Sequence, residues 1–161
     1  MVATANKRER FYTMSNRPTR DDWAMSIAKI TAQQSTCKRR AVGAVLVNSK
    51  GHILATGYNG VASKQPHCID AEHACVGADT PIGVSSDTCQ ALHAEQNALL
   101  QCKNMYDIHT AYVTLSPCIT CCKLLLNTSC QRIVFMDEYP HGASKELWTS
   151  AGREWIKYEV Q

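Results

Sequence analysis

The fold class is decided by AYVTLSPCITCCKLLLNTSCQRIVFM (111–136), in which strand-like and helix-like segments alternate. AYVTL (111–115) and RIVFM (132–136) have the apolar, β-branched composition of buried strands. The segment 118–128 between them predicts a helix, and Pro117 fits the first helical position because its missing N–H costs nothing there. A strand–helix–strand order predicts a sheet covered by helices on both faces.

The segments on either side extend this α/β pattern. Toward the C-terminus, helices are predicted at about 94–103 and 144–151, and a last strand near EWIKYEV (154–160). Toward the N-terminus, the runs 42–48 and 52–59 are strand-like, and Ser49-Lys50-Gly51 between them predicts a hairpin turn. An opening hairpin makes the predicted sheet mixed rather than all parallel.

The remaining segments define one domain with an extension and an insertion. Residues 1–17 show little apolar periodicity and are interpreted as an N-terminal extension of a single domain, 18–161. DDWAMSIAKITAQQS (21–35) predicts a helix with Trp23, Ile27 and Ile30 at helical spacing. Residues 60–92 are rich in Pro, Gly, Ser, Cys and His, which predicts a long Cys/His-rich insertion that something else must hold in place.

Composition narrows the class of protein. The net charge of +3 is too mild to choose between a phosphorylated small molecule and nucleic acid. The N-terminal residues lack the apolar core of a signal peptide, and the longest apolar run, 41–47, is too short to span a bilayer. We therefore expect a cytoplasmic protein without a membrane partner. Nine cysteines, an odd number, then favour metal ligation or buried thiols over a disulfide framework.

Two predicted helix starts carry the residues of a zinc site. Cys118 and Cys121 are three apart in one opening turn and face the same way, where the helix dipole favours thiolates. His93 at the other helix start supplies an imidazole. Three protein ligands leave the fourth tetrahedral position to water, which is typical of a catalytic rather than a structural zinc site.

Glu95, two residues after the histidine, is interpreted as the acid/base that moves the proton of this water. His-x-Glu followed by Pro-Cys-x-x-Cys is the pattern of zinc nucleobase deaminases. Each half alone has ordinary explanations: a surface His-x-Glu, a redox-active Cys-x-x-Cys or a structural zinc knuckle. Their combination at two helix starts favours the deaminase. Cys102, Cys122 and Cys130 are interpreted as core residues.

Longer motifs resemble one family. STCKRRAVGAVLV, GYNG, HAEQNAL, TLSPCITCCKLL and VFMDEY together resemble deoxycytidylate (dCMP) deaminases, and the resemblance runs from Trp23 to Val160. It implies the three-layer α/β/α cytidine-deaminase fold, with a five-stranded mixed sheet. It also implies hydrolysis of dCMP to dUMP and ammonia, which supplies dUMP for dTMP synthesis.

The resemblance assigns roles to individual residues. Zinc would be bound by His93, Cys118 and Cys121, with Glu95 as the proton shuttle. Asn59 would contact the sugar, the backbone at Ala94 and Ser116 would hold the polar edge of the pyrimidine, and Tyr139 would lie near the nucleotide. The 5′-phosphate needs cationic or amide donors, and the candidates are Arg39, Arg40, Lys64 and His141.

Some relatives carry a second, structural zinc, and the insertion holds residues for one. The candidate ligands are Cys37, Cys68, His73, Cys75 and Cys89. Cys37 and Cys68 match the positions of ligands in those relatives, while the choice between His73 and Cys75 stays open. A closed four-ligand site would explain how a Gly- and Pro-rich segment is ordered. Family members are commonly hexamers, activated by dCTP with Mg²⁺ and inhibited by dTTP.

Three alternatives remain at this point. A tRNA adenosine deaminase shares the zinc chemistry, but GYNG, the insertion and the modest charge disfavour a nucleic-acid partner. A deaminase of cytidine or dCTP differs in phosphate count, which the sequence does not decide. A non-catalytic zinc scaffold or a DNA-uptake accessory protein would have no use for Glu95 beside an open coordination position.

Overall fold

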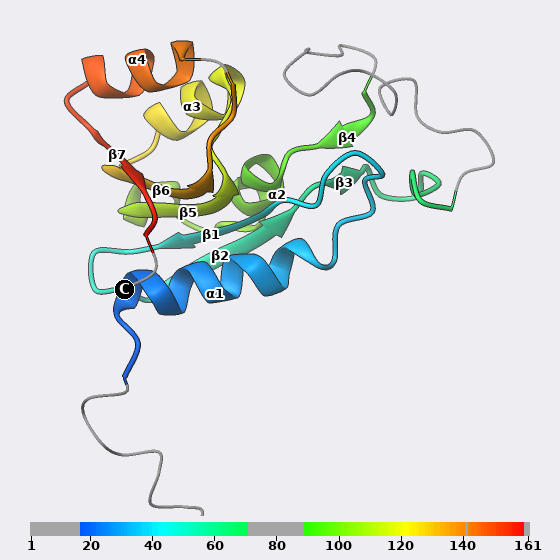
Figure 1. The fold of residues 1–161 in the computed structure, drawn as a ribbon, viewed down its shortest axis with the longest axis horizontal. Helices are drawn as coiled ribbons and strands as arrows, with labels where there is room; N and C mark the ends of the chain where they lie inside the picture. Colours follow the sequence, from blue (N-terminus) through cyan, green and yellow to red (C-terminus); the bar gives the residue numbers. More distant parts are fainter. Residues whose placement is uncertain (1–16, 71–88, 141, 160–161) are drawn as a thin grey trace, which may run out of the picture.

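A five-stranded mixed sheet forms the centre of the computed structural model, which describes residues 17–70, 89–140 and 142–159 (Figure 1). Its strand order is β2-β1-β5-β6-β7. β1 runs antiparallel to both β2 and β5, whereas β5, β6 and β7 are parallel, so the predicted mixed sheet is confirmed. The strands are β1 (Gly43–Val47), β2 (Ile53–Tyr58), β5 (Thr110–Leu115), β6 (Arg132–Asp137) and β7 (Glu154–Lys157).

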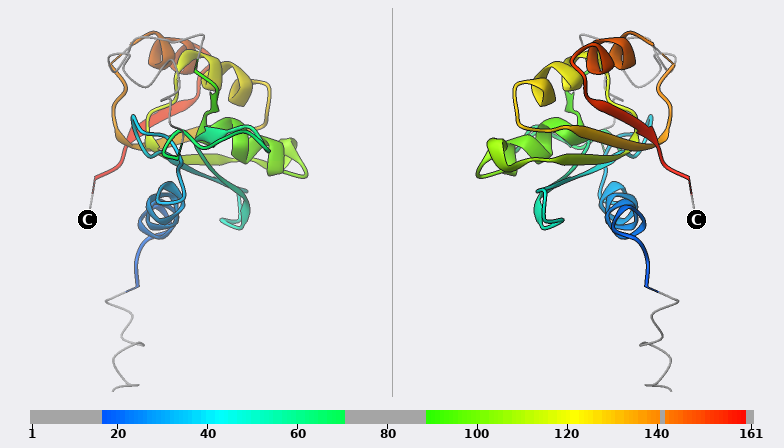
Figure 2. Two further views of the ribbon diagram at one scale, coloured as in Figure 1. Left: turned by 90° about the vertical axis from the view of Figure 1, so that its right-hand side faces the viewer. Right: turned by 90° about the vertical axis from the view of Figure 1, so that its left-hand side faces the viewer.

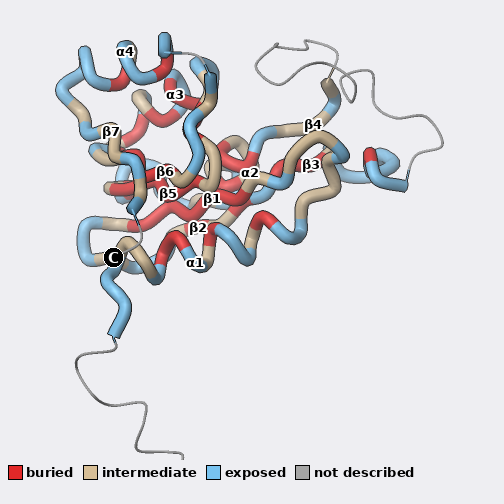
Figure 3. The backbone as a smooth tube through the Cα atoms, in the orientation of Figure 1, coloured by how far each residue is buried: buried red, intermediate tan, exposed pale blue. Residues whose placement is uncertain are grey.

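Helices cover both faces of the sheet and complete the three predicted layers. They are α1 (Arg20–Ala32), α2 (Ala94–Gln101), α3 (Ile119–Leu126) and α4 (Ala143–Ser150), with a short 3₁₀ turn, η3 (Met105–Asp107). The helix α1 lies on one face, and α3 and α4 lie on the other (Figures 1 and 2). Alternate residues of β1 point to opposite faces: Val45 packs in the cluster with α1, and Leu46 in the cluster with the other helices. The buried residues gather along the sheet and the helix sides that face it (Figure 3).

The helix α1 presents a different side to the sheet from the one its large apolar residues suggest. Trp23 and Ile30 are 42% and 65% exposed, and the buried side consists of Ala24, Met25, Ala28 and Ala32. The cause is close packing, because a Cβ at Gly43 of β1 would overlap the backbone of α1 at Ala28. The small side chains of Ala28 and Ala32 allow this approach, whereas Trp23 and Ile30 turn outward.

The start of α1 is held by a capping box. The Thr19 hydroxyl accepts a hydrogen bond from the Asp22 backbone N–H at 3.1 Å, and the Asp22 carboxylate accepts one from the Thr19 N–H, also at 3.1 Å. These bonds satisfy two backbone donors that a helix start leaves unpaired. None of the helices within the described ranges is long and apolar enough to cross a bilayer.

A two-stranded sheet closes the base of the insertion predicted at 60–92. β3 (Gly60–Val61) pairs antiparallel with β4 (Ala91–Leu92), placing Gly60 opposite Leu92. This pairing could not be predicted from the sequence, because two residues per strand are too few for a periodic pattern. The insertion therefore leaves and re-enters the domain at one place, next to the start of α2. Residues 71–88 of the insertion and 1–16 of the predicted extension lie outside the described residues.

The contact between β2 and α2 leads to a test of the fold. A Cβ at Gly57 would overlap the carbonyl oxygen of Ala94 and the backbone nitrogen of Ala98, so Gly57→Ala must push α2 off the sheet. We expect a loss of about 1–3 kcal/mol in the free energy of unfolding, measured by urea denaturation. Gly142→Ala is the control, since its Cβ would have no neighbour within 4 Å. Equal stability of the two variants would contradict the described packing.

Candidate active site

The site lies where the parallel strands β5 and β6 end. The chain leaves β5 through Ser116 and Pro117 to reach Cys118, and leaves β6 toward Tyr139. The helix α2 enters from β4 with His93 directly before it. Carboxyl ends of parallel strands meet at one edge of a sheet, which is where ligands of such sheets bind. Residues from three separate segments are thereby brought together.

His93 is the N-cap of α2 and has extended backbone angles (φ −75°, ψ 157°). Its backbone N–H donates to the side-chain oxygen of Gln96 at 2.7 Å, which anchors the turn. Asn97 donates from its amide to the carbonyl oxygen of Tyr58 at 2.7 Å and fixes α2 to the end of β2. The imidazole is therefore held by a helix that is itself tied to the sheet.

Cys118 is the N-cap of α3, and the helix begins at Ile119. The expectation that Pro117 occupies the first helical position is wrong by two residues. Cys118 instead adopts the extended backbone of a cap residue (φ −70°, ψ 170°), and its carbonyl accepts the N–H of Cys122 at 2.9 Å. Pro117 then fixes the approach to the cap. Cys121 still follows within the first turn, so both thiols reach the same side as predicted.

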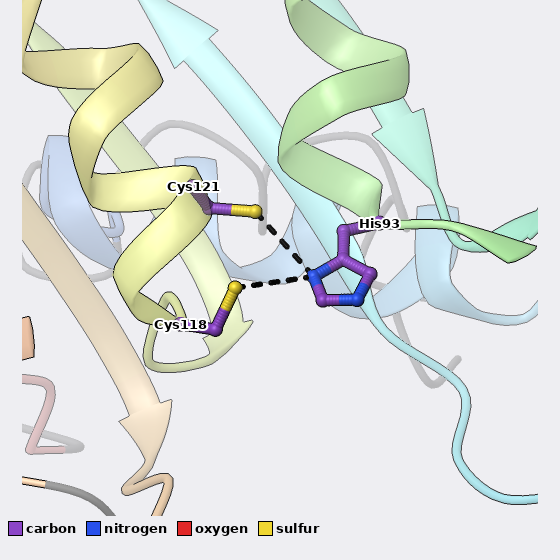
Figure 4. A group of neighbouring side chains, drawn as sticks. All are labelled: His93, Cys118 and Cys121. Atoms are coloured by element: carbon purple, nitrogen blue, oxygen red, sulfur yellow. Dashed lines mark hydrogen bonds between the residues drawn. The ribbon is translucent and has the colours of Figure 1, made fainter. Parts of the chain in front are cut away.

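The three predicted ligand atoms meet in one cluster (Figure 4). Nδ1 of His93 lies 3.4 Å from Sγ of Cys118 and 3.4 Å from Sγ of Cys121. All three atoms lie within 4.8 Å of one another, and no other such group of three or more potential ligands occurs among the described residues. Tetrahedral zinc, with Zn–S near 2.3 Å and Zn–N near 2.0–2.1 Å, needs N and S about 3.5 Å apart. The residues therefore fit a zinc ion of that geometry.

The charge states of the two thiols also suit a cation. Hydrogen bonding from Cys121 and from His93 lowers the pKa of Cys118 to about 4, although burial opposes the change. The same bond to Cys118, together with burial, raises the pKa of Cys121 above its usual range. The pair therefore favours a negative charge on Cys118, and a bound divalent cation would favour loss of the proton from Cys121 as well.

Glu95 lies beside this cluster but outside it. Its side chain is 3% exposed, and it is not one of the three grouped ligand atoms. Burial raises the pKa of Glu95 to about 6, with His93 opposing the shift. A carboxyl group with a pKa near neutrality can both take and release a proton, which is the property of a general acid/base.

His93, Glu95 and Cys118 line a cleft of about 140 Å³ that is open to solvent. Its lining brings together most of the predicted substrate contacts and further residues: Cys37, Arg39, Arg40, Val42, Asn59, Cys89, Ala91, His93, Glu95, Leu115, Ser116, Cys118 and Tyr139. Ala94 is fully buried and does not line it. Asn59, Ser116 and Tyr139 therefore line the same cleft as His93, Glu95 and Cys118.

Asn59 is engaged by the loop that precedes β1. Its side-chain oxygen accepts hydrogen bonds from the Ser35 hydroxyl at 2.7 Å and the Val42 N–H at 2.8 Å. Its amide nitrogen donates to the carbonyl oxygen of Arg40 at 2.8 Å. One amide hydrogen is left for a ligand, so Asn59 has a structural task in addition to the sugar contact predicted for it.

The lining of the cleft distinguishes between the four residues predicted as candidates to bind the 5′-phosphate. Arg39 and Arg40 line it. Lys64 lies in an exposed turn with φ 65° and does not line the cleft. His141 lies outside the described residues. Apart from His93, the basic residues among the described residues that line the cleft are therefore Arg39 and Arg40, in the short loop before β1.

The candidates for a second zinc are only partly described. Cys37 and Cys89 both line the cleft, and Cys68 is buried. His73 and Cys75 lie outside the described residues. Cys122 and Cys130 are fully buried, which raises the pKa of each to about 12 and agrees with their interpretation as core residues. Cys102 is half-buried and packs against the same core.

Two residues of the site were missed from the sequence. Gln96 holds the backbone of His93, and Asp137 forms an ion pair with Arg40 at 2.7 Å. A Gln three residues after a helix N-cap is a capping-box signal that could have been found. Asp137 lies in the quoted VFMDEY motif, but its partner is 97 residues away in sequence and could not be read from spacing.

Residues 18–137 match the sequence model of the cytidine and deoxycytidylate deaminase zinc-binding region. The chain therefore belongs to the zinc-dependent cytidine and deoxycytidylate deaminase family, as its motifs and mixed five-stranded sheet indicated.

Individual relatives agree with this membership. The chain is 36% identical over 127 residues to the deoxycytidylate deaminase of Mycobacterium phage D29, covering 76% of this chain and 98% of that one. It is 34% identical over 137 residues to ComE operon protein 2 of Bacillus subtilis, covering 82% and 67%. Its fold is similar to the dCMP deaminase of cyanophage S-TIM5 in complex with dCMP and dUMP, with a TM-score of 0.70, 28% identity and coverage of 88% and 98%.

Adjacent cysteines offer a test of the metal centre. Cys121→Ser should lower the zinc content of the purified protein by one ion per chain, because Sγ of Cys121 belongs to the ligand cluster. Cys122→Ala should keep that ion, since its thiol is fully buried and is not part of the cluster. Zinc is measured by elemental analysis of protein of known concentration. Loss of zinc in both variants, or in neither, would contradict the assignment of ligands.

Proposed function

We propose that this chain removes the amino group from C4 of dCMP by hydrolysis, which gives dUMP and ammonia. It thereby supplies dUMP for dTMP synthesis. The observation that carries the proposal is a buried carboxyl group, Glu95, beside a His/Cys/Cys cluster in a cleft with two arginines. Membership of the deaminase family and similarity to deoxycytidylate deaminases support the same substrate.

His93, Cys118 and Cys121 would hold zinc, and the ion would supply an activated water next to the cytosine ring. Glu95 does the proton transfer. It takes the proton of the attacking water and delivers it to N3 of the ring as oxygen adds to C4. Glu95 then takes the second proton, from the hydroxyl group now on C4, and delivers it to the amine, so that the C4–N bond breaks, the C4 carbonyl forms and ammonia leaves. Its pKa near 6 places both protonation states within reach at neutral pH.

The pyrimidine would be held by backbone groups on either side of the ligands. The Ser116 N–H already donates to the carbonyl of Asp137 at 2.8 Å, so we assign the Ser116 carbonyl to the pyrimidine's polar edge. The N–H of Ala94 is among those that a helix start leaves without an intrahelical partner, and it would serve the same edge. Asn59 would contact the sugar with its remaining amide hydrogen, and Tyr139 would lie against the nucleotide.

The 5′-phosphate would bind to Arg39 and Arg40, because these two line the cleft and Lys64 does not. A guanidinium group can present paired N–H donors to phosphate oxygens, which gives direction as well as charge. Phosphate binding at this wall would select dCMP over deoxycytidine.

Exchange of Glu95 tests the proposed reaction. Glu95→Gln keeps the size of the side chain but cannot carry the proton, so turnover of dCMP should fall by about 10²–10⁴-fold while zinc content stays at the wild-type value. Turnover is followed by ultraviolet absorbance and zinc by elemental analysis. Full activity would exclude Glu95 as the acid/base. A loss of zinc together with activity would make Glu95 a ligand instead.

We further propose a second, structural zinc bound by Cys37, Cys68, Cys89 and either His73 or Cys75. The ends of the insertion meet at β3 and β4, close to the cleft that Cys37 and Cys89 line, which supports a site at its base. Two zinc ions per wild-type chain would agree with this proposal, and one would contradict it.

Regulation and assembly follow from the family resemblance alone. We propose a cytoplasmic hexamer, activated by dCTP with Mg²⁺ and inhibited by dTTP. Sedimentation gives the oligomeric state, and dCMP turnover with each effector gives the regulation. A monomer indifferent to both nucleotides would contradict these proposals.

A further inference from the structure

An ion pair holds the guanidinium group of Arg40 in place. Nη2 of Arg40 lies 2.7 Å from Oδ2 of Asp137, and the two side chains are 36% and 58% exposed. Arg40 belongs to the loop before β1, and Asp137 is the last residue of β6. The pair therefore joins two elements whose ends border the cleft.

The backbone of Arg40 is fixed independently of its side chain. The amide of Asn59 donates to the Arg40 carbonyl at 2.8 Å, and the same side chain accepts the N–H of Val42 at 2.8 Å. The backbone of this loop is thus held by hydrogen bonds at Arg40 and at Val42. These bonds do not set the direction of the long Arg40 side chain, and within the part of the chain that the structure describes its ion-pair partner is Asp137.

Asp137 is in turn fixed relative to the metal centre. Its carbonyl accepts the N–H of Ser116 at 2.8 Å, and Ser116 precedes the ligand Cys118 by two residues. The hydroxyl of Ser116 also accepts the N–H of Tyr139 at 2.7 Å. The segment after β6 and the segment that leads to the metal ligands therefore form one hydrogen-bonded unit. The carboxylate of Asp137 projects from that unit toward Arg40.

We propose that Asp137 is a positioning residue that sets where the Arg40 guanidinium lies relative to the metal centre. In doing so it makes the enzyme selective for a nucleoside monophosphate over the nucleoside. This inference rests on the proposed function, in which Arg40 binds the 5′-phosphate. A guanidinium group has five N–H donors, and the contact with Asp137 engages one nitrogen. Among the described residues the other donors of Arg40 remain available to phosphate oxygens, and Asp137 sets how far these donors lie from His93 and Cys118 in the cleft lining.

A positioning role differs measurably from a merely structural one. If Asp137 acts through Arg40, its removal should affect the substrate that has a phosphate and spare the one that lacks it. The effect should appear in KM rather than in kcat, because the groups that move protons are untouched. The effect should also vanish when Arg40 is already absent, since interacting residues are non-additive in a double-mutant cycle.

The experiment measures kcat and KM for dCMP and deoxycytidine in the wild type, Asp137→Ala, Arg40→Ala and the double variant. Asp137→Ala should lower kcat/KM for dCMP about tenfold, through KM, and change that for deoxycytidine by less than about twofold. The double variant should have the same kcat/KM for dCMP as Arg40→Ala alone. Asp137→Asn, which keeps the shape and an acceptor oxygen, should recover part of the loss.

Glu154→Ala is the matched control. Glu154 is a carboxylate of similar exposure, 61%, paired with an arginine, Arg132, at 3.5 Å. It does not line the cleft, and Arg132 keeps Asp21 as a second partner, so both substrates should be turned over as by the wild type.

Each other outcome overturns the inference. An equal loss on both substrates would make Asp137 a structural residue, and fully additive losses in the double variant would separate it from Arg40. Unchanged kinetics in Asp137→Ala would remove any role in selectivity. In all three cases the proposed function would still hold, provided that the wild type turns over dCMP. A wild type that is inactive on dCMP would overturn both the proposed function and the positioning role of Asp137.

Discussion

The close packing of α2 against β2 at Gly57 is the contact on which the site depends. With no side chain at this position, the backbone of α2 at Ala94 and Ala98 approaches the strand directly. His93 is the residue before this helix, and Glu95 lies in its first turn. A bulkier residue at 57 would shift both chemical groups away from the two cysteines. Packing between a strand and a helix therefore determines whether three ligand atoms can surround one ion.

Burial also sets the chemistry of Glu95. The residue is only 3% exposed, although it belongs to the lining of the cleft. Enclosure disfavours the charged form and raises its pKa toward neutrality, whereas an exposed glutamate would stay ionised and be a poor proton donor. The fold thus gives Glu95 the chemical properties of the proposed acid/base as well as its position.

Much of this arrangement could be predicted from local sequence. Periodicity predicted the sheet and its opening hairpin. The spacing of Cys118 and Cys121 and the helix start at His93 predicted the cluster, because two residues within one helical turn are held in place by local geometry. Features that depend on close approach could not be predicted. The outward position of Trp23 follows from Gly43, which lies in a different element and is far from Trp23 in the sequence.

The phosphate candidates illustrate the same limit. Arg39, Arg40 and Lys64 each add one positive charge to the sequence, and charge alone does not rank them. What distinguishes them is the side of the domain on which each loop lies, and that is set by tertiary contacts such as those of Asn59. The start of α3 differs from the prediction for a local reason, since Cys118 has the extended backbone of an N-cap and the helix begins two residues after Pro117.

The most direct test of the account is the substrate preference of the purified, zinc-loaded chain. Rates of deamination are followed by ultraviolet absorbance for dCMP, deoxycytidine and dCTP at equal concentration. A catalytic zinc centre at the end of a cleft with one arginine-bearing wall predicts that dCMP is turned over with the highest kcat/KM of the three. Failure to deaminate dCMP, in protein that holds its zinc, would contradict the account.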